Sequence, residues 1–227
     1  MKDLSHYKQV ASLFEYPDAE FVYRVSEVIK ILQERCPEAG AEVQEFFELL
    51  PKDDLEKMRE LFTRSFDVQS LTTLDLGYVL FGDDYKRGEM LANLNREHIK
   101  VGNDLKSELA DHLPNVLRLL PKLEDKELLI ELVENIIAPA LRIMDGEFSP
   151  DRVEMKNKAY KKHYKTLIET PPEIKSATLY RHIIRALHKL LKVDFSFTEK
   201  PAFGVKSDFL KSITRENDIE AKAESFV

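Results

Sequence analysis

The chain contains little of what a disulfide-bonded, sheet-rich or membrane-spanning protein needs. It has a single cysteine, Cys36, which cannot form an intramolecular disulfide and fits a reducing compartment. Only 7 of its 227 residues are glycine, and the alternation of β-branched residues that is typical of strands is almost absent. The longest apolar run, residues 136–141, is too short to cross a bilayer, and the N-terminal segment is too polar for a secretory signal. These absences predict a cytoplasmic, helical protein that does not insert into a membrane.

Basic residues are also outnumbered, because the chain has 34 of them and 41 acidic residues. A protein that binds nucleic acid more often carries a basic surplus, so we expect no nucleic-acid partner. An acidic chain instead favours basic partners.

The spacings that indicate a reactive centre are missing. None of the 6 histidines follows a glutamate by three residues, and no two of them are four residues apart, so the helical metal motifs are absent. There is no Cys-x-x-Cys pair and no glycine-rich phosphate-binding loop. Cys36 ends an apolar stripe and is predicted to be a buried structural thiol. The sequence therefore predicts a protein that is not an enzyme and needs no metal or other cofactor.

Apolar residues recur at spacings of three and four along most of the chain, which is typical of amphipathic helices. We predict helices over residues 5–15, 18–36, 41–50, 54–66, 71–81, 85–102, 114–120, 125–144, 150–169 and 178–192. Asp18 and either Asp53 or Asp54 are expected to cap helices, and Pro139 should kink the 125–144 helix. The result is an all-α, single-domain bundle of about eight to ten helices over residues 1–194. Residues 195–227 are predicted to be a partly ordered tail with a helix around 206–223.

The stretch Asp111-His112-Leu113-Pro114 is a predicted junction between helices. Proline suits the first turn of a helix and disfavours helical conformation in the residue before it. Asp111 would then cap the helix that begins at Pro114. Two interpretations remain open here: Asp111 is a cap beside an ordinary half-buried His112, or the junction belongs to a binding site.

Aromatic side chains gather near the loops, and they also allow two interpretations. Phenylalanines at helical spacing usually belong to the core. Alternatively, they line an apolar groove with an acidic rim, which would suit an amphipathic basic peptide bound as a helix. The aromatic residues are Phe62, Phe66, Tyr78, Phe81 and Tyr85, and the rim would be Asp67, Asp83, Asp84 and Asp111.

Four motifs occur in one order: LFEYPD at 13–18, LFTRSFD at 61–67, a glycine-bounded loop with Arg87 at 82–88, and DHLP at 111–114. In this respect the chain resembles the NarJ branch of the TorD/DmsD/NarJ family of molybdoenzyme assembly chaperones. The likeness covers residues 7–145 and is found again at 178–192. Residues 146–176, with their lysine cluster, look like a charged insertion relative to shorter members.

The resemblance implies a TorD/NarJ-like fold and a chaperone of nitrate reductase assembly. Such a protein binds the N-terminal, twin-arginine-like segment of the catalytic subunit of a molybdenum-containing nitrate reductase. It keeps that subunit competent for cofactor insertion and membrane attachment. The DHLP motif is linked to peptide binding, with Asp111 expected to pair with an arginine and His112 to orient the loop. The site expected from the resemblance and the groove comprises Asp111, His112, Leu113, Pro114, Phe62, Phe66, Asp67, Tyr78, Phe81 and Arg87.

Several alternatives stay open from sequence alone. The client could be another molybdoenzyme, of the perchlorate, selenate or dimethyl-sulfoxide reductase type. The chain could be a helical docking scaffold that uses the lysine-rich face at 156–165, or a helical enzyme or metal carrier, although the missing ligand spacings count against the last two. A homodimer is also compatible with the sequence.

Overall fold

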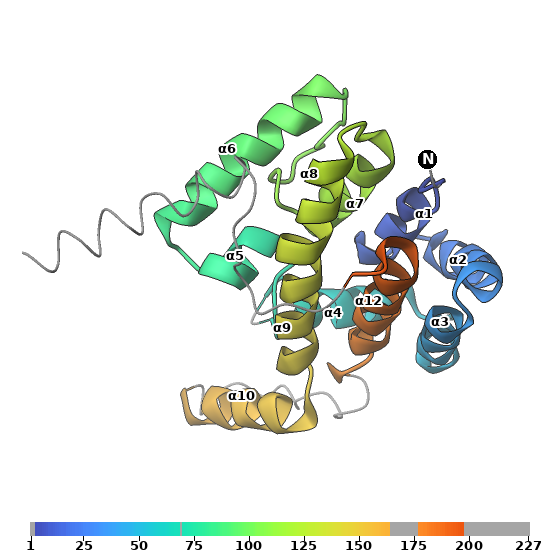
Figure 1. The fold of residues 1–227 in the computed structure, drawn as a ribbon. Helices are drawn as coiled ribbons and strands as arrows, with labels where there is room; N and C mark the ends of the chain where they lie inside the picture. Colours follow the sequence, from blue (N-terminus) through green and yellow to red (C-terminus); the bar gives the residue numbers. More distant parts are fainter. Residues whose placement is uncertain (1–2, 69, 164–176, 198–227) are drawn as a thin grey trace, which may run out of the picture.

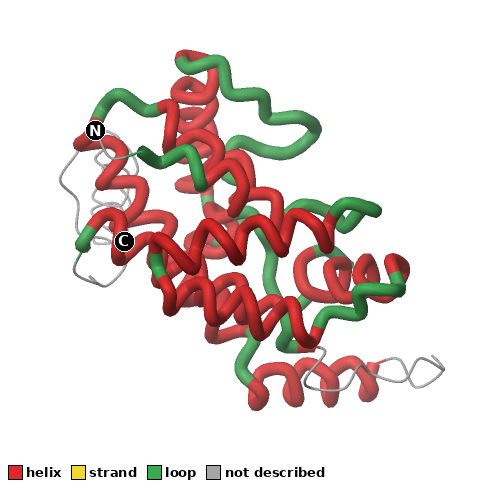
Figure 2. Tube along the Cα trace, turned by 90° about the vertical axis from the view of Figure 1, so that its right-hand side faces the viewer, coloured by secondary structure: helices red, strands yellow, loops and turns green. Residues whose placement is uncertain are grey.

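Helices account for every regular element in the part of the chain that the structure describes (Figure 1). The structure is a computed structural model, and it describes residues 3–68, 70–163 and 177–197. Figure 2 displays helices joined by loops, with no strand in these ranges. The predicted all-α bundle is therefore confirmed. None of the helices in these ranges combines the length and the apolar character that crossing a membrane needs.

The first half of the bundle is built from short and medium helices. They are α1 (Tyr7–Ala11), η1 (Ser12–Phe14), α2 (Phe21–Arg35), α3 (Pro37–Leu49), α4 (Leu55–Phe66), α5 (Leu76–Phe81) and α6 (Tyr85–Lys100).

The second half contains the helices that follow the long loop after α6. They are α7 (Leu113–Leu119), η2 (Leu120–Lys122), α8 (Lys126–Leu132), η3 (Val133–Ile137), α9 (Ala138–Glu147), α10 (Pro150–His163) and α12 (Tyr180–Phe195). The predicted tail helix at 206–223 and the end of the charged segment at 164–176 lie outside the described residues.

Helices from both ends of the chain pack together in the centre. α3 packs against α2 and α12, while α12 also packs against α9 and α1 packs against α7. Figure 1 has α12 between α9 and α3, with α6 and α10 farther out. The apolar stripes of these helices form one core, which includes Cys36, 3% exposed as the sequence predicted. Burial of such stripes is the main stabilising contribution to a helical bundle.

Most helix starts follow the local signals in the sequence. Asp54 caps α4, because its side chain accepts a hydrogen bond from the Lys57 amide at 3.0 Å. α10 begins at Pro150, directly after Ser149, as predicted. Asp18 was wrongly assigned as the cap of α2, which begins at Phe21. Its carboxylate instead accepts the Glu20 amide at 2.9 Å and orders the approach to the helix.

The predicted helix over 71–81 is wrong in its first half. Only Leu76–Phe81 is helical, and the preceding segment forms an isolated antiparallel bridge between Asp75 and His112. The Leu76 amide donates to the Asp111 carbonyl at 3.0 Å, and the Leu113 amide donates to the Leu74 carbonyl at 2.8 Å. Apolar content alone could not reveal this pairing, because its partner lies far along the chain.

The long helix predicted over 125–144 is present as an uninterrupted helical stretch over residues 126–147. A π-helical turn, Val133–Ile137, separates α8 from α9. Pro139 follows this turn closely within a continuous helical stretch, and because it has no amide hydrogen it cannot donate to a carbonyl of the preceding turn. A π-helical turn contains one residue more than an α-helical turn, and such turns are a known cause of local distortion in helices.

Candidate functional site

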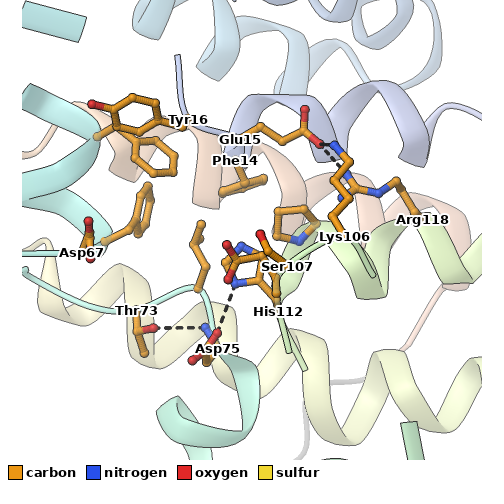
Figure 3. A pocket seen from close by; sticks show the side chains of 15 residues that line it. Phe14, Glu15, Tyr16, Asp67, Thr73, Asp75, Lys106, Ser107, His112 and Arg118 are labelled. Carbon is orange, nitrogen blue, oxygen red and sulfur yellow. Dashed lines mark hydrogen bonds and ion pairs between the residues drawn. The ribbon is translucent and has the colours of Figure 1, made fainter. Parts of the chain in front are cut away.

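A cavity of about 560 Å³ lies beside the turn that precedes α7 (Figure 3). It is bordered by the end of η1, the end of α4, the bridged segment before α5, the loop after α6 and the start of α7. The lining residues are Phe14, Glu15, Tyr16, Phe62, Phe66, Asp67, Thr73, Leu74, Asp75, Lys106, Ser107, Glu108, His112, Pro114 and Arg118.

One side of the cavity is aromatic. Phe62 and Phe66 are 8% and 7% exposed, and their ring centroids are 5.3 Å apart. Tyr16 packs edge-on against Phe62 at 5.6 Å and is itself 55% exposed. Behind them, the ring of Tyr180 packs against both phenylalanines at 5.7 and 5.0 Å. Because rigid rings bury a large apolar area at small entropic cost, this wall suits an apolar side chain of a ligand.

The rest of the cavity lining is polar, and its acidic side chains outnumber its basic ones. Glu15, Asp67, Asp75 and Glu108 contribute carboxylates, whereas Lys106 and Arg118 contribute the cations. In Figure 3 Tyr16 and Asp67 lie on one side of the cavity, and Glu15 lies on the other side with Lys106 and Arg118. An apolar wall with a carboxylate rim is complementary to a peptide that is both apolar and basic.

His112 is held on the cavity wall by a chain of ion pairs. Its Nδ1 lies 3.1 Å from Asp75 Oδ1, and Asp75 Oδ2 accepts from Arg87 at 2.9 Å. Arg87 also donates from Nε to Asp111 Oδ2 at 3.1 Å. The hydrogen bond from His112 and the ion pair with Arg87 keep the pKa of Asp75 below its usual range, although burial opposes this. Asp75 therefore accepts the Nδ1 proton, which fixes the orientation of the His112 ring at the cavity wall.

The structure corrects the role expected of Asp111. It is fully buried and does not cap α7, because His112 occupies the N-cap position without a side-chain hydrogen bond. Asp111 Oδ2 accepts from Arg87 and from the Gly77 amide at 3.1 Å, so it cannot meet a peptide arginine directly. Oδ1 has no hydrogen-bond partner among the described residues. Burial, reinforced by the charge of Asp75, raises the pKa of Asp111 above its usual range.

The structure brings some of the expected site residues together and separates others. Phe62, Phe66, Asp67, His112 and Pro114 border the cavity. Asp111 and Leu113 are fully buried and do not border the cavity, and Arg87 is connected to His112 through the ion pair with Asp75.

Tyr78 and Phe81, on α5, do not border the cavity. Tyr78 is 44% exposed, and the Arg87 guanidinium lies over its ring at 5.4 Å. The expected rim acids Asp83 and Asp84 do not border the cavity either, and Asp84 instead caps α6 through the Lys86 amide at 2.9 Å. α5 packs against α6 and α9, and the loop that joins α5 to α6 does not border the cavity.

Three of the four sequence motifs meet around this cavity, and the fourth reaches it indirectly. Residues 14–16 come from LFEYPD, residues 62–67 from LFTRSFD, and His112 and Pro114 from DHLP. Arg87, from the 82–88 loop motif, bridges Asp75 and Asp111. Phe14, Glu15 and Tyr16 were missed as site residues, although their motif was recognised. Nothing in the sequence marked the loop residues Lys106, Ser107 and Glu108.

The loop that carries Lys106 is anchored by a buried polar network. His98 Nε2 donates to the Ala110 carbonyl at 3.0 Å, and its Nδ1 accepts from Asn103 at 2.9 Å. Asn115 Nδ2 donates to the carbonyls of Leu105 and Leu109, both at 3.1 Å. Burial lowers the pKa of His98, which keeps the ring neutral and able to accept from Asn103. These hydrogen bonds hold the loop between α6 and α7 in place.

A second cluster has the residue types of a metal site. Glu42 and Glu45, one turn apart on α3, and His182 of α12 bring their ligand atoms within 4.8 Å of one another. Glu42 already accepts from His182 at 2.9 Å and from Lys189 at 2.7 Å. An ion pair between two packed helices explains this arrangement, and the sequence could not reveal it because His182 comes from a distant helix.

No protein-family model matches the chain, and no curated protein is significantly similar to it. The likeness to molybdoenzyme chaperones therefore rests on the four motifs and remains a prediction.

Proposed function

We propose that this protein is an assembly chaperone that binds the N-terminal segment of the catalytic subunit of a respiratory nitrate reductase. It holds the segment in the cavity beside His112 while the molybdenum cofactor is inserted and before the subunit attaches to the membrane. It acts by binding and release, without a reaction of its own. The proposal joins the family resemblance to the geometry of the cavity.

The observation that carries the proposal is the meeting of three ordered motifs around one cavity of about 560 Å³. These motifs supply an aromatic wall through Phe62 and Phe66, and carboxylates through Glu15 and Asp67. An arginine-bearing apolar segment needs both, because the aliphatic and aromatic side chains bury apolar area while the guanidinium requires a charged acceptor. His112 and its supporting ion pairs fix the wall between these two regions.

Calorimetric titration of the intact chain with two synthetic peptides tests this function. One peptide is amphipathic and contains two adjacent arginines, and the other is identical except that citrulline replaces both arginines. We expect the arginine peptide to bind and the citrulline peptide to bind much more weakly. Binding of neither peptide would refute the proposed function.

A matched pair of variants links binding to the cavity. Asp67→Asn removes a carboxylate from the cavity wall, whereas Asp83→Asn removes one from the loop between α5 and α6 that does not border it. Because exposed ion pairs contribute about 0.2–1 kcal/mol, Asp67→Asn should weaken binding of the arginine peptide roughly twofold to fivefold. Asp83→Asn should leave it unchanged, and equal effects would exclude this cavity. Mass spectrometry of proteins that co-purify with the chain from anaerobically respiring cells would then identify the client.

A further inference from the structure

Within the proposed function, we propose that Glu15 is the subsite for an arginine side chain of the bound segment and that Lys106 is the internal cation which this arginine displaces. The inference rests on the proposed function and adds the carboxylate that receives the arginine, Glu15, and the cation that competes for it, Lys106. It concerns one carboxylate, two cations and the loop that carries one of them.

Glu15 has one engaged oxygen and one that is open. Lys106 Nζ and Arg118 both approach Oε1, at 2.9 and 2.7 Å. None of the described residues bonds to Oε2, and the side chain is 30% exposed. Although burial by itself raises the pKa of Glu15, Lys106 and Arg118 keep it below its usual range, so the carboxylate is charged at neutral pH.

The two cations differ in how firmly they are held. Arg118 lies on α7, is 20% exposed and makes a second hydrogen bond to Asn115 Oδ1 at 3.1 Å. Lys106 lies on the loop, is 58% exposed and makes its side-chain contact with Glu15 alone among the described residues. Arg118 is therefore a fixed partner, and Lys106 is an exchangeable one.

The backbone at Lys106 has an unusual conformation that its neighbours hold in place. Its φ of 55° lies in the left-handed region, which costs a residue with a side chain free energy relative to glycine. A local turn compensates for part of this, because the Lys106 amide donates to Asp104 Oδ1 at 2.9 Å. Asn115 Nδ2 holds the carbonyl of the preceding residue, Leu105, at 3.1 Å, so displacement of Lys106 from Glu15 requires movement of the lysine side chain and not of the loop.

An arginine has a chemical advantage over Lys106 at this position. A guanidinium presents two parallel donors that match both oxygens of a carboxylate, whereas an ammonium is a single point charge. Glu15 Oε2 is the oxygen that a second parallel donor would use. The carboxylate of Glu108, which also lines the cavity, adds to the attraction for a cation that enters it.

The test uses the arginine and citrulline peptides with three variants of the intact chain. Lys106→Gln removes the competitor, and we expect the arginine peptide to bind about twofold to fivefold more tightly. Lys30→Gln is the control, because it removes the same charge from an ion pair with Glu27 on α2, a residue that does not border the cavity. Glu15→Gln removes the subsite, and binding of the arginine peptide should fall below that of the wild type.

Comparison of the two peptides distinguishes a failure of this inference from a failure of the proposed function. A gain in affinity for the arginine peptide, absent with the citrulline peptide and absent in Lys30→Gln, supports the inference. Unchanged affinity of Lys106→Gln, or an equal gain with the citrulline peptide, overturns it while the proposed function stands. Failure of every variant and the wild type to bind the arginine peptide overturns both. Circular dichroism of Glu15→Gln checks that the fold is retained, and weakened binding with native helicity supports the subsite.

Discussion

Asp194, near the end of α12, and Asp111, just before α7, are both buried carboxylates that pair with an arginine on another helix. Asp194 has partners on both oxygens, because His6 and Tyr7 approach Oδ2 at 2.8 and 3.0 Å and Arg35 donates to Oδ1 at 2.9 Å. Asp111 has partners on Oδ2 alone. Both carboxylate oxygens of Asp194 therefore accept hydrogen bonds, whereas only one carboxylate oxygen of Asp111 does.

We infer from this difference that Asp194 stabilises the fold, whereas Asp111 positions residues of the cavity wall. Asp194 joins α12 to the start of the chain and to α2, which are far apart in sequence. Asp111 instead begins a series of ion pairs that passes through Arg87 and Asp75 and ends at His112 on the cavity wall. A buried polar atom without a partner is unfavourable, and such atoms concentrate where a protein positions a binding site at the expense of stability.

The largest effect should come from Asp194→Ala. It removes the acceptor of His6, Tyr7 and Arg35 together, and loss of one member of a buried ion pair typically reduces the free energy of unfolding by about 3–5 kcal/mol. Asp111→Ala should reduce it by about 1–3 kcal/mol, because Arg87 keeps its bond to Asp75. Urea denaturation followed by circular dichroism measures both values.

Peptide binding should rank the same two variants in the opposite order. Asp111→Ala should weaken binding of the arginine peptide while helicity is retained, because Arg87 and His112 lose their support. Asp194→Ala should bind the peptide normally under conditions in which it is folded. Equal losses of stability together with equal losses of binding would remove the distinction between the two regions.

An intermediate effect is expected where the backbone approaches Asp111 most closely. A Cβ at Gly77 would lie 2.7 Å from Asp111 Oδ2 and 3.0 Å from Arg87 Cγ, so Gly77→Ala must displace the ion pair. Overpacking of this kind should lower the free energy of unfolding by about 1–2 kcal/mol and weaken peptide binding. Calorimetry and urea denaturation check both effects.

Gly88→Ala provides the control for this substitution. Gly88 lies in α6, and apart from its chain neighbours and the backbone of its own helix a Cβ there would have no heavy atom within 4 Å. Alanine is a better helix former than glycine by up to about 1 kcal/mol, so Gly88→Ala should be neutral or stabilising and should bind the peptide normally. A loss of binding in Gly88→Ala, or none in Gly77→Ala, would contradict the role given to the Arg87–Asp111 pair.

The contrast also explains which parts of the molecule the sequence could predict. The all-α architecture and the helix starts at Asp54 and Pro150 follow from apolar spacing and local capping signals. The role of Asp111 did not follow, because a cap is the most common local use of an aspartate before a helix, and its true partner, Arg87, lies on α6.

The site was predictable only to the extent that its residues share motifs. Phe62, Phe66 and Asp67 were found because they stand together in one stretch, and His112 because of its neighbouring proline. Contacts between segments could not be found in this way. Asp75 reaches His112 through a bridge of two extended segments, and Lys106 reaches Glu15 across 91 positions. Sequence patterns within one stretch predict helices and loops, whereas contacts between distant stretches depend on how the helices pack together.

The smallest effect, and the most direct comparison of the two aspartates, is in the pH dependence of stability. Burial, with the charge of Asp75, raises the pKa of Asp111, whereas hydrogen bonds from His6, Arg35 and Tyr7 outweigh burial and lower the pKa of Asp194. Folding therefore favours the protonated form of Asp111 and the ionised form of Asp194. The two carboxylates should respond to acid with opposite signs.

Asparagine variants isolate each response, because asparagine has the same shape and does not titrate. As the pH falls from the raised pKa of Asp111 toward the unfolded-state value of about 3.9, the wild type should gain stability relative to Asp111→Asn. As the pH falls below about 3.9 toward the lowered pKa of Asp194, the wild type should lose stability relative to Asp194→Asn. Urea denaturation at a series of pH values measures the sign of each change. Changes of the same sign in both pairs would mean that the two buried aspartates are equivalent, and the assignment of one to structure and the other to the binding site would fail.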